Sequence, residues 1–327
     1  MAVHRLVCDL AFLEKFRDNY HAILNNARLE ELMEWLNLYQ CIRNSKLSMT
    51  CTKSDFIDFV QNEKEQSGLS SNILKLQKSL RDQCRLTYDA CPLSDSTIDE
   101  EDSYLRSSYL IDDINNKKQG GLNKGVSAIT SHSDNDIRKL YHCSPITIRR
   151  LETNTWQNIL SGIPPMNSLV LLDRYIFASQ ERINRNLFPI LETLLPNNLD
   201  VSFHLTIITC NNINNNVRGN EQYMNLVNQL NNRRPNLDIK ISICICPMGD
   251  FHDRCIITNN FLIRSSSGFD LFDNTNRAIH EMTLDKYHRG FSLDVGNIID
   301  EYLNCAKRIF NDFHNTHLGV NTNRLFD

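Results

Sequence analysis

Residues 247–273 decide the fold of this chain, and they read PMGDFHDRCIITNNFLIRSSSGFDLFD. The apolar run 239–246 stops at a Pro-x-Gly turn, and the chain resumes with His252, Asp253 and Arg254 before a second apolar run. This pattern predicts strand, turn, strand, with titratable groups where the second strand begins. Alternate residues of a strand point to one face, so His252 and Arg254 are expected to project together. An imidazole beside a guanidinium suits a phosphate, because the first can attack or carry protons and the second is a fixed two-pronged donor.

The sequence around this stretch predicts alternating strands and helices. The expected elements are strand 168–172, helix 181–195, strand 201–209, helix 220–232, strand 237–246, a hairpin of 254–258 and 261–264, and helix 295–314. Strands separated by crossover helices imply a mainly parallel sheet with right-handed connections. Such sheets bind ligands at the carboxyl ends of their strands, and Asp173 and the turn before His252 fall there.

The N-terminal part of the chain has a different pattern. Apolar residues recur at intervals of three and four in residues 14–43 and 70–85, so residues 1–92 are expected to form a small, mainly helical domain. Residues 93–136 are rich in Ser, Asp, Asn, Lys and Gly and predict a polar linker. A short strand ending near Asp9 leaves a second interpretation open, in which this part is an acidic, metal-dependent nuclease fold.

The overall prediction is an α/β protein, with the helical N-terminal domain, the linker, and an α/β domain at residues 137–327 that has a mixed, mainly parallel sheet. A chain of 327 residues is long enough for two such domains. The net charge of -4 argues against a generally basic nucleic-acid coat protein, although a local basic cleft remains compatible with it. Eleven scattered cysteines without a Cys-x-x-Cys pair favour a reducing cytoplasm. Without a run of about 18 apolar residues, no membrane span is expected.

The central motif resembles that of the phospholipase D superfamily. That family carries His-x-Lys, then Asp after four residues and Gly-Ser after six more, on a hairpin that follows a β-α-β-α-β unit. Here His252 takes the His place, Arg254 the Lys place, Asn259 the Asp place, and the Ser-Ser pair 266–267 the Gly-Ser place. The His-Asp-Arg variant is also similar to the phospholipase D-like C-terminal domain of microtubule-interacting-and-trafficking proteins. The resemblance covers residues 145–315.

The resemblance implies a metal-independent phosphodiesterase whose nucleophile is His252, with Arg254 and Asn259 completing the catalytic set. Arg in place of Lys keeps the charge but cannot donate a proton, and Asn259 lacks the negative charge of Asp. The expected phosphate-binding residues are Ser265, Ser266 and Ser267, and the expected supporting residues are Asp173, Asp270 and Glu281. No cofactor and no metal are expected, because no His and carboxylate spacing suits a metal.

The chain contains one copy of this histidine motif, which bears on its expected oligomeric state. Active members of the family use two histidines, so this chain is expected to form a homodimer that brings two copies of His252 together. Nucleic acid is the preferred substrate over lipid, since no amphipathic membrane-binding face is evident. Family analogy alone suggests a role in microbial defence or in a mobile element.

Two other function classes stay open. The first is an inactive phospholipase D-like module that binds nucleic acid, a phospholipid headgroup or a protein. The second is a structural subunit that docks to a protein partner through residues 1–136. The polar residues after the hairpin either line the cleft or form a polar rim; they are His280, Glu281, Lys286, His288 and Arg289.

Overall fold

The computed structural model describes residues 5–26, 29–67, 71–88, 107–111, 127–130, 145–163, 166–210, 216–247, 254–289, 293–313 and 316–326. The chain divides into two compact units. The first unit comprises Met1–Tyr141 with Arg289–Asn297, and the second comprises His142–His288 with Ile298–Asp327.

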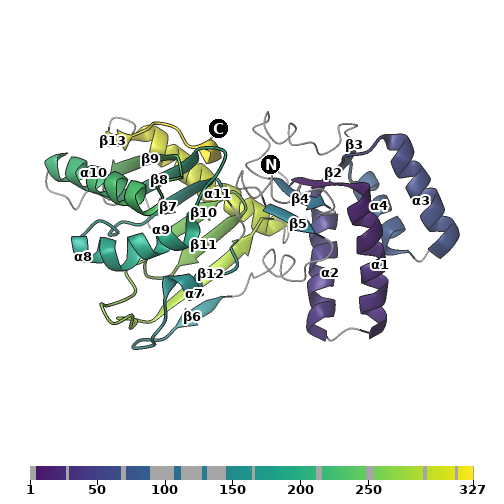
Figure 1. Cartoon of the computed structure of the whole chain (residues 1–327), viewed down its shortest axis with the longest axis horizontal. Helices are drawn as coiled ribbons and strands as arrows, with labels where there is room; N and C mark the ends of the chain where they lie inside the picture. Colours follow the sequence, from purple (N-terminus) through teal and green to yellow (C-terminus); the bar gives the residue numbers. More distant parts are fainter. Residues whose placement is uncertain are drawn as a thin grey trace. The chain divides into compact units, whose positions relative to one another are not determined.

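The first unit is built on a parallel sheet of five strands in the order β3-β2-β1-β4-β5 (Figure 1). The strands are β1 (Arg5–Cys8), β2 (Lys46–Met49), β3 (Leu86–Tyr88), β4 (Ser107–Ile111) and β5 (Ser127–Thr130), and all their pairings are parallel. Four helices accompany them: α1 (Leu10–Asn26), α2 (Leu29–Asn44), α3 (Lys53–Ser67) and α4 (Asn72–Asp82). Their apolar faces form one core with the strands, including Leu6, Phe12, Phe16, Leu38, Ile42, Leu47, Phe56, Leu76 and Leu80.

This unit differs from the sequence prediction in its sheet. The expected helices are present, yet β1 to β3 belong to a parallel sheet, and β4 and β5 lie inside residues 93–136, where a polar linker is predicted. The prediction of a linker is wrong for these two strands. These strands are short, with the sequences SSYLI and SAIT. Segments of this length contain too few residues to show a detectable periodicity of apolar side chains.

The second unit contains a mixed sheet of eight strands in the order β13-β9-β8-β7-β10-β11-β12-β6. The parallel strands are β7 (Ser168–Leu172), β8 (Phe203–Cys210) and β9 (Ile239–Cys246), and the antiparallel strands are β10 (Arg254–Thr258), β11 (Phe261–Ser265), β12 (Met282–His288), β6 (Ile146–Ile148) and β13 (His317–Gly319). The α/β class with a mixed sheet is therefore confirmed. The expectation of a mainly parallel sheet is wrong, because two of the seven pairings among the described strands are parallel and five are antiparallel. The hairpin predicted around positions 259 and 260 is formed by β10 and β11.

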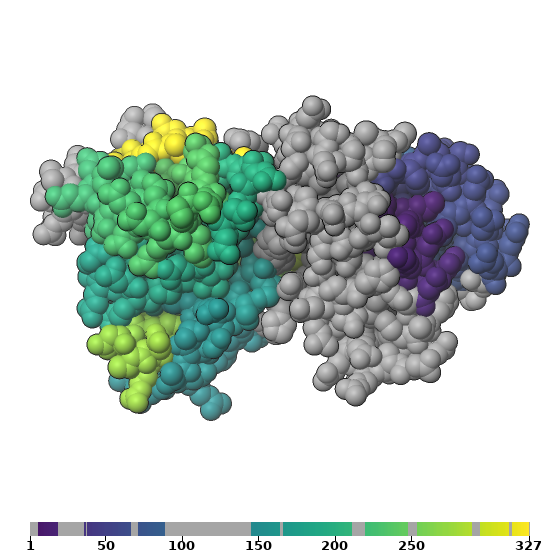
Figure 2. Space-filling model, in the orientation of Figure 1, coloured from purple at the N-terminus to yellow at the C-terminus, as the bar shows by residue number. Residues whose placement is uncertain are grey.

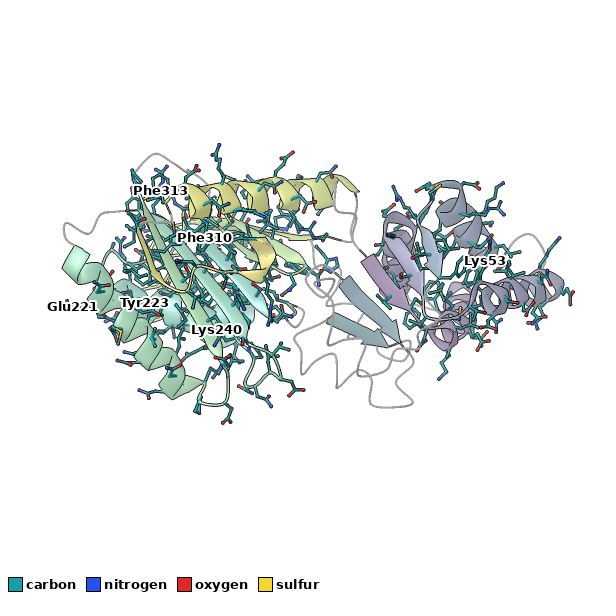
Figure 3. All side chains as sticks on the ribbon, turned by 90° about the horizontal axis from the view of Figure 1, so that it is seen from above. Lys53, Glu221, Tyr223, Lys240, Phe310 and Phe313 are labelled. Carbon is teal, nitrogen blue, oxygen red and sulfur yellow. The ribbon has the colours of Figure 1, made fainter. Side chains whose placement is uncertain are left out.

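Helices cover both faces of this sheet. One face carries α7 (Trp156–Ile159), α8 (Gln180–Arg182), η4 (Ile183–Leu187), α9 (Phe188–Leu194) and α10 (Asn216–Arg233), and the other carries α11 (Leu293–Asp312) (Figures 1 and 3). In Figure 2 the teal and green segments that include α9 and α10 form much of the surface turned to the viewer. No helix in the described part of the chain is long and apolar enough to cross a membrane.

The helical run α8–η4–α9 contains a π turn immediately before Pro189. The amide of Phe188 donates to the carbonyl of Ile183, five residues back, and this is the π-helical hydrogen bond. Proline has no N–H to donate, so a regular α-helical ladder would be interrupted at Pro189 in any case. Such turns change the direction of side chains, and here the π turn contains Asn186, which is fully buried.

One buried amide helps to fasten the C-terminal segment to the parallel strands. Asn323 accepts a hydrogen bond from Ser168 Oγ at 2.7 Å and donates to Thr206 Oγ1 at 2.9 Å. Gly319 ends β13 at a φ of +91°, and a Cβ atom there would meet the ring of Tyr223, which Figure 3 labels on α10. The backbone of the segment therefore lies too close to its neighbours for any side chain at position 319.

Candidate functional site

Arg254 begins β10 and pairs with Ser265, the last residue of β11. Within the described residues its buried Nε has no hydrogen-bond partner. Its guanidinium carbon lies 6.0 Å from the centroid of the Tyr175 ring. A buried charged donor without a partner costs free energy, and an anion at this place would remove that cost.

The turn after β11 packs directly against this arginine. Gly268 has a φ of +99°, and a Cβ atom at this position would lie 3.0 Å from Asp173 Oδ2 and 3.1 Å from Arg254 Cδ. The hydroxyl of Ser265 shapes the turn, because it donates to the carbonyl of Gly268 at 2.6 Å and accepts from its amide at 3.0 Å. Glycine is thus required here both for conformation and for space.

Asp173 connects the carboxyl end of β7 to the same turn. Its Oδ1 accepts from the amide of Tyr175 and its Oδ2 from the amide of Phe269, each at 2.7 Å. Burial raises the pKa of this carboxyl, while the two backbone hydrogen bonds and the charge of Arg254 act in the opposite direction. The structure therefore places Asp173 beside Arg254, in a position to support it.

Asp270 belongs to a second network on the same turn. It pairs with Arg182 Nε at 2.8 Å and accepts from Asn186 Nδ2 at 3.0 Å. The Oδ1 of Asn186 faces three donors, which are Trp156 Nε1 and the amides of Leu271 and Phe272. Asn186 and Arg182 were not predicted as site residues, and the one sequence signal for this helical turn is the proline that follows Asn186 by three residues.

The three serines of the turn have separate partners. The hydroxyl of Ser265 bonds the turn itself, and that of the exposed Ser266 accepts from the amide of Thr283 at 3.0 Å. Ser267 Oγ lies 2.9 Å from His280 Nε2. The three hydroxyls therefore do not share one set of contacts, as a common role in phosphate binding would require. Ser267 is the serine whose hydroxyl contacts a titratable side chain, that of His280.

Asn259 lies at the other end of β10 from Arg254. It is buried, its Oδ1 accepts from the amides of Asn167 and Ser168 at 3.0 and 3.2 Å, and its Nδ2 donates to Asn167 Oδ1 at 2.9 Å. It follows Arg254 by five positions of extended chain, which is about 16 Å at 3.3 Å per residue. Asn259 therefore does not lie close to Arg254. Its hydrogen bonds to Asn167 and Ser168 hold the start of β7.

Other predicted residues are dispersed. Glu281 is exposed just before β12. Lys286 and His288 are buried on β12: Lys286 Nζ donates to the carbonyl of Ile159 at 2.5 Å, and the His288 ring packs edge-on against Phe261. These two residues therefore form neither a cleft lining nor a polar rim. His252 and Asp253 lie outside the described residues.

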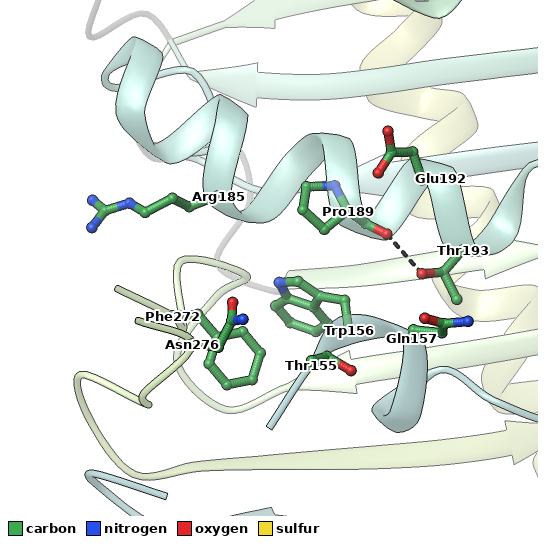
Figure 4. A pocket seen from close by; sticks show the side chains of 9 residues that line it. All are labelled: Thr155, Trp156, Gln157, Arg185, Pro189, Glu192, Thr193, Phe272 and Asn276. Atoms are coloured by element: carbon green, nitrogen blue, oxygen red, sulfur yellow. Dashed lines mark hydrogen bonds between the residues drawn. The ribbon is translucent and has the colours of Figure 1, made fainter. Parts of the chain in front are cut away.

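A separate pocket of about 420 Å³ lies between α7, α9 and the loop after Phe272. Figure 4 shows Trp156 and Phe272 facing it, with Arg185 and Glu192 on the helical side. Its lining residues do not include any predicted site residue. Among the residues that the structure describes, no group of three or more His, Cys, Asp or Glu could hold a metal ion.

Comparison with known proteins adds little. No protein-family model matches the chain, and no curated protein matches it. One solved structure, that of TrmBL2, an archaeal chromatin protein with a novel mode of DNA binding, aligns at 13% identity and a TM-score of 0.26. The alignment covers 48% of this chain and 51% of that chain, and a similarity this weak supports no conclusion on fold or function.

Proposed function

We propose that the second unit is a phospholipase D-like phosphodiesterase in which His252 attacks phosphorus and Arg254 holds the non-bridging oxygens. The observation that carries this proposal is the buried Nε of Arg254, which has no hydrogen-bond partner among the described residues and lies beside the turn at Gly268. A guanidinium can donate two parallel hydrogen bonds to a phosphate, and such charge-assisted bonds are stronger where water is partly excluded. The hairpin that follows three parallel strands supports the same assignment.

The chemistry requires a nucleophile and a separate proton donor. His252 forms a bond to phosphorus while the bond to the leaving oxygen breaks, and that oxygen needs a proton. Arg254 stabilises the charge that develops on the phosphate. The resemblance to the family implies a homodimer, in which the second copy of His252 gives the proton. Nucleic acid is the proposed substrate class.

The test is cleavage of single- and double-stranded oligonucleotides in the presence of EDTA. We expect the wild type to cleave, His252→Ala to lose activity by about 10³-fold or more, and Arg254→Gln to lose about 10²-fold. His317→Ala, a histidine substitution on β13 at the far edge of the sheet, is the matched control and should keep full activity. Equal cleavage by wild type and His252→Ala, or none by the wild type, refutes the proposal.

A second candidate is a binding module without catalysis. The engagement of Asn259 with Asn167 and Ser168, and of the Ser265 hydroxyl with its own turn, favours it, because these groups then serve the fold. This candidate predicts phosphodiester binding that survives His252→Ala and fails in Arg254→Glu, with no turnover in any variant.

A further inference from the structure

The pocket between α7, α9 and the loop after Phe272 has two aromatic walls that one buried amide holds in place. Asn186 Oδ1 accepts a hydrogen bond from Trp156 Nε1 at 3.1 Å and another from the amide of Phe272, also at 3.1 Å. The two rings pack edge to face, with 5.6 Å between their centroids. Because the indole N–H is already bonded, Trp156 offers the pocket apolar surface alone. The walls are therefore formed before any ligand binds.

Arg185 is the basic residue of this pocket. It lines one end, and Gln157 and Thr193 line the other (Figure 4). Its Nη2 pairs with Glu181, four residues back, at 3.2 Å, while its Nε has no hydrogen-bond partner among the described residues. The side chain of Glu181 is 68% exposed, and an ion pair this exposed contributes little to stability. An anion in the pocket can therefore compete with Glu181 for the guanidinium.

Glu192 is the acidic residue of the lining, and its partner is held more firmly. It forms an ion pair with Arg233, the last residue of α10, whose guanidinium also lies 4.7 Å above the ring of Phe188. Beside it, Thr193 Oγ1 donates to the carbonyl of Pro189 at 2.7 Å and keeps its lone pairs for a donor on a ligand. The pocket thus combines a cation that a ligand can engage with hydrogen-bond acceptors at the opposite end.

We propose that this pocket binds a small amphipathic anion, a molecule in which a carboxylate or phosphate is joined to an apolar body of one or two rings. The anionic group pairs with Arg185, and the apolar body lies against Trp156, Pro189 and Phe272. The volume of about 420 Å³ falls within the range of small-molecule pockets, about 300–1,000 Å³. None of the lining residues belongs to the histidine motif, so the site does not depend on the proposed function.

Isothermal titration calorimetry of the full chain with naphthalene probes tests the site. 1-Naphthylacetate and 1-naphthyl phosphate carry the two kinds of anion, and 1-naphthylacetamide is the neutral analogue of the first. We expect at least one anion to bind about tenfold more tightly than the amide, because charge-assisted hydrogen bonds are the stronger ones. Arg185→Gln should abolish this preference and leave the affinity for the amide unchanged. Glu181→Gln should tighten anion binding about two- to fivefold, because it removes the competing carboxylate.

The control is Arg308→Gln, the same substitution at an exposed arginine of α11 on the other face of the sheet, and it should change none of the affinities. Dissociation constants weaker than about 1 mM for both anions refute the proposal. Equal affinities for the anions and the amide, or a preference for anions that survives in Arg185→Gln, refute it as well. If Arg185→Gln unfolds at a lower temperature than wild type, Glu181→Gln decides, since anion binding that is unchanged or weaker in that variant contradicts the competition for Arg185.

Discussion

Substitution of Gly268 by alanine is the sharpest single perturbation of the candidate site. The residue has a φ of +99°, and an added Cβ would lie 3.0 Å from Asp173 Oδ2 and 3.1 Å from Arg254 Cδ. The backbone conformation alone costs an alanine about 1–3 kcal/mol. Moving the Asp173 carboxylate also weakens its bond to the Phe269 amide, for about 1–3 kcal/mol more. The total expected loss of stability is about 2–6 kcal/mol.

Gly162 provides the matched control. Its φ is +78°, and a Cβ atom there would meet nothing within 4 Å, so Gly162→Ala reports the conformational cost without the contacts. The difference between the two variants therefore measures how tightly the turn packs against Asp173 and Arg254. A second readout, the affinity for a short oligonucleotide, should fall for Gly268→Ala and stay unchanged for Gly162→Ala.

The assay is denaturant unfolding followed by tryptophan fluorescence. The chain has two tryptophans, so a Trp35→Phe background makes the buried Trp156 of the second unit the reporter. Equal losses of stability in the two alanine variants, together with equal oligonucleotide affinities, would refute the packing described for Gly268.

Three further outcomes are expected. Gly319→Ala should destabilise the second unit by more than the control variant does, because its Cβ would collide with the carbonyl oxygen of Ile241; thermal unfolding measures this. Glu63→Ala should cost about 1–3 kcal/mol in denaturant unfolding, because it removes the buried carboxylate that accepts from both Arg17 and the Ser71 hydroxyl, while Arg17 keeps its pair with Asp18; a loss below about 0.5 kcal/mol would contradict these contacts. Burial lowers the pKa of Lys286 below its ordinary value, so the unfolded chain binds more protons between the two values and stability rises with pH through that window; Lys286→Met should abolish the rise in a pH series of unfolding curves.

Long or well-bounded elements were predictable from sequence. Residues 254–258 and 261–264 are apolar runs on either side of two asparagines, and the structure has a hairpin there that is one residue longer. Strand β12 escaped prediction for a clear reason. Its inward-facing residues are Met282, Leu284, Lys286 and His288, so two of the four are polar and the alternation of apolar side chains is hidden.

The motif located the candidate site but did not assign its parts. The spacing of the motif predicts Asn259 and Arg254 as members of one catalytic set. In the structure the two residues lie at opposite ends of the extended strand β10. The pairing of Ser267 with His280, 13 positions apart, depends on the loop at Phe272 folding back on Ala278. The sequence alone does not predict the bridge between Phe272 and Ala278.

The sequence by itself determined the alternation of strands and helices in the second unit and the place of Arg254 at the start of a strand, because local periodicity and turn residues act over a few positions. Only the tertiary structure decided which polar groups meet. The contacts of Asn186 with residues 270–272 and of Asp173 with Phe269 join positions more than eighty apart. Buried donors and acceptors must find partners wherever the packed chain supplies them, and that choice is made by the whole fold.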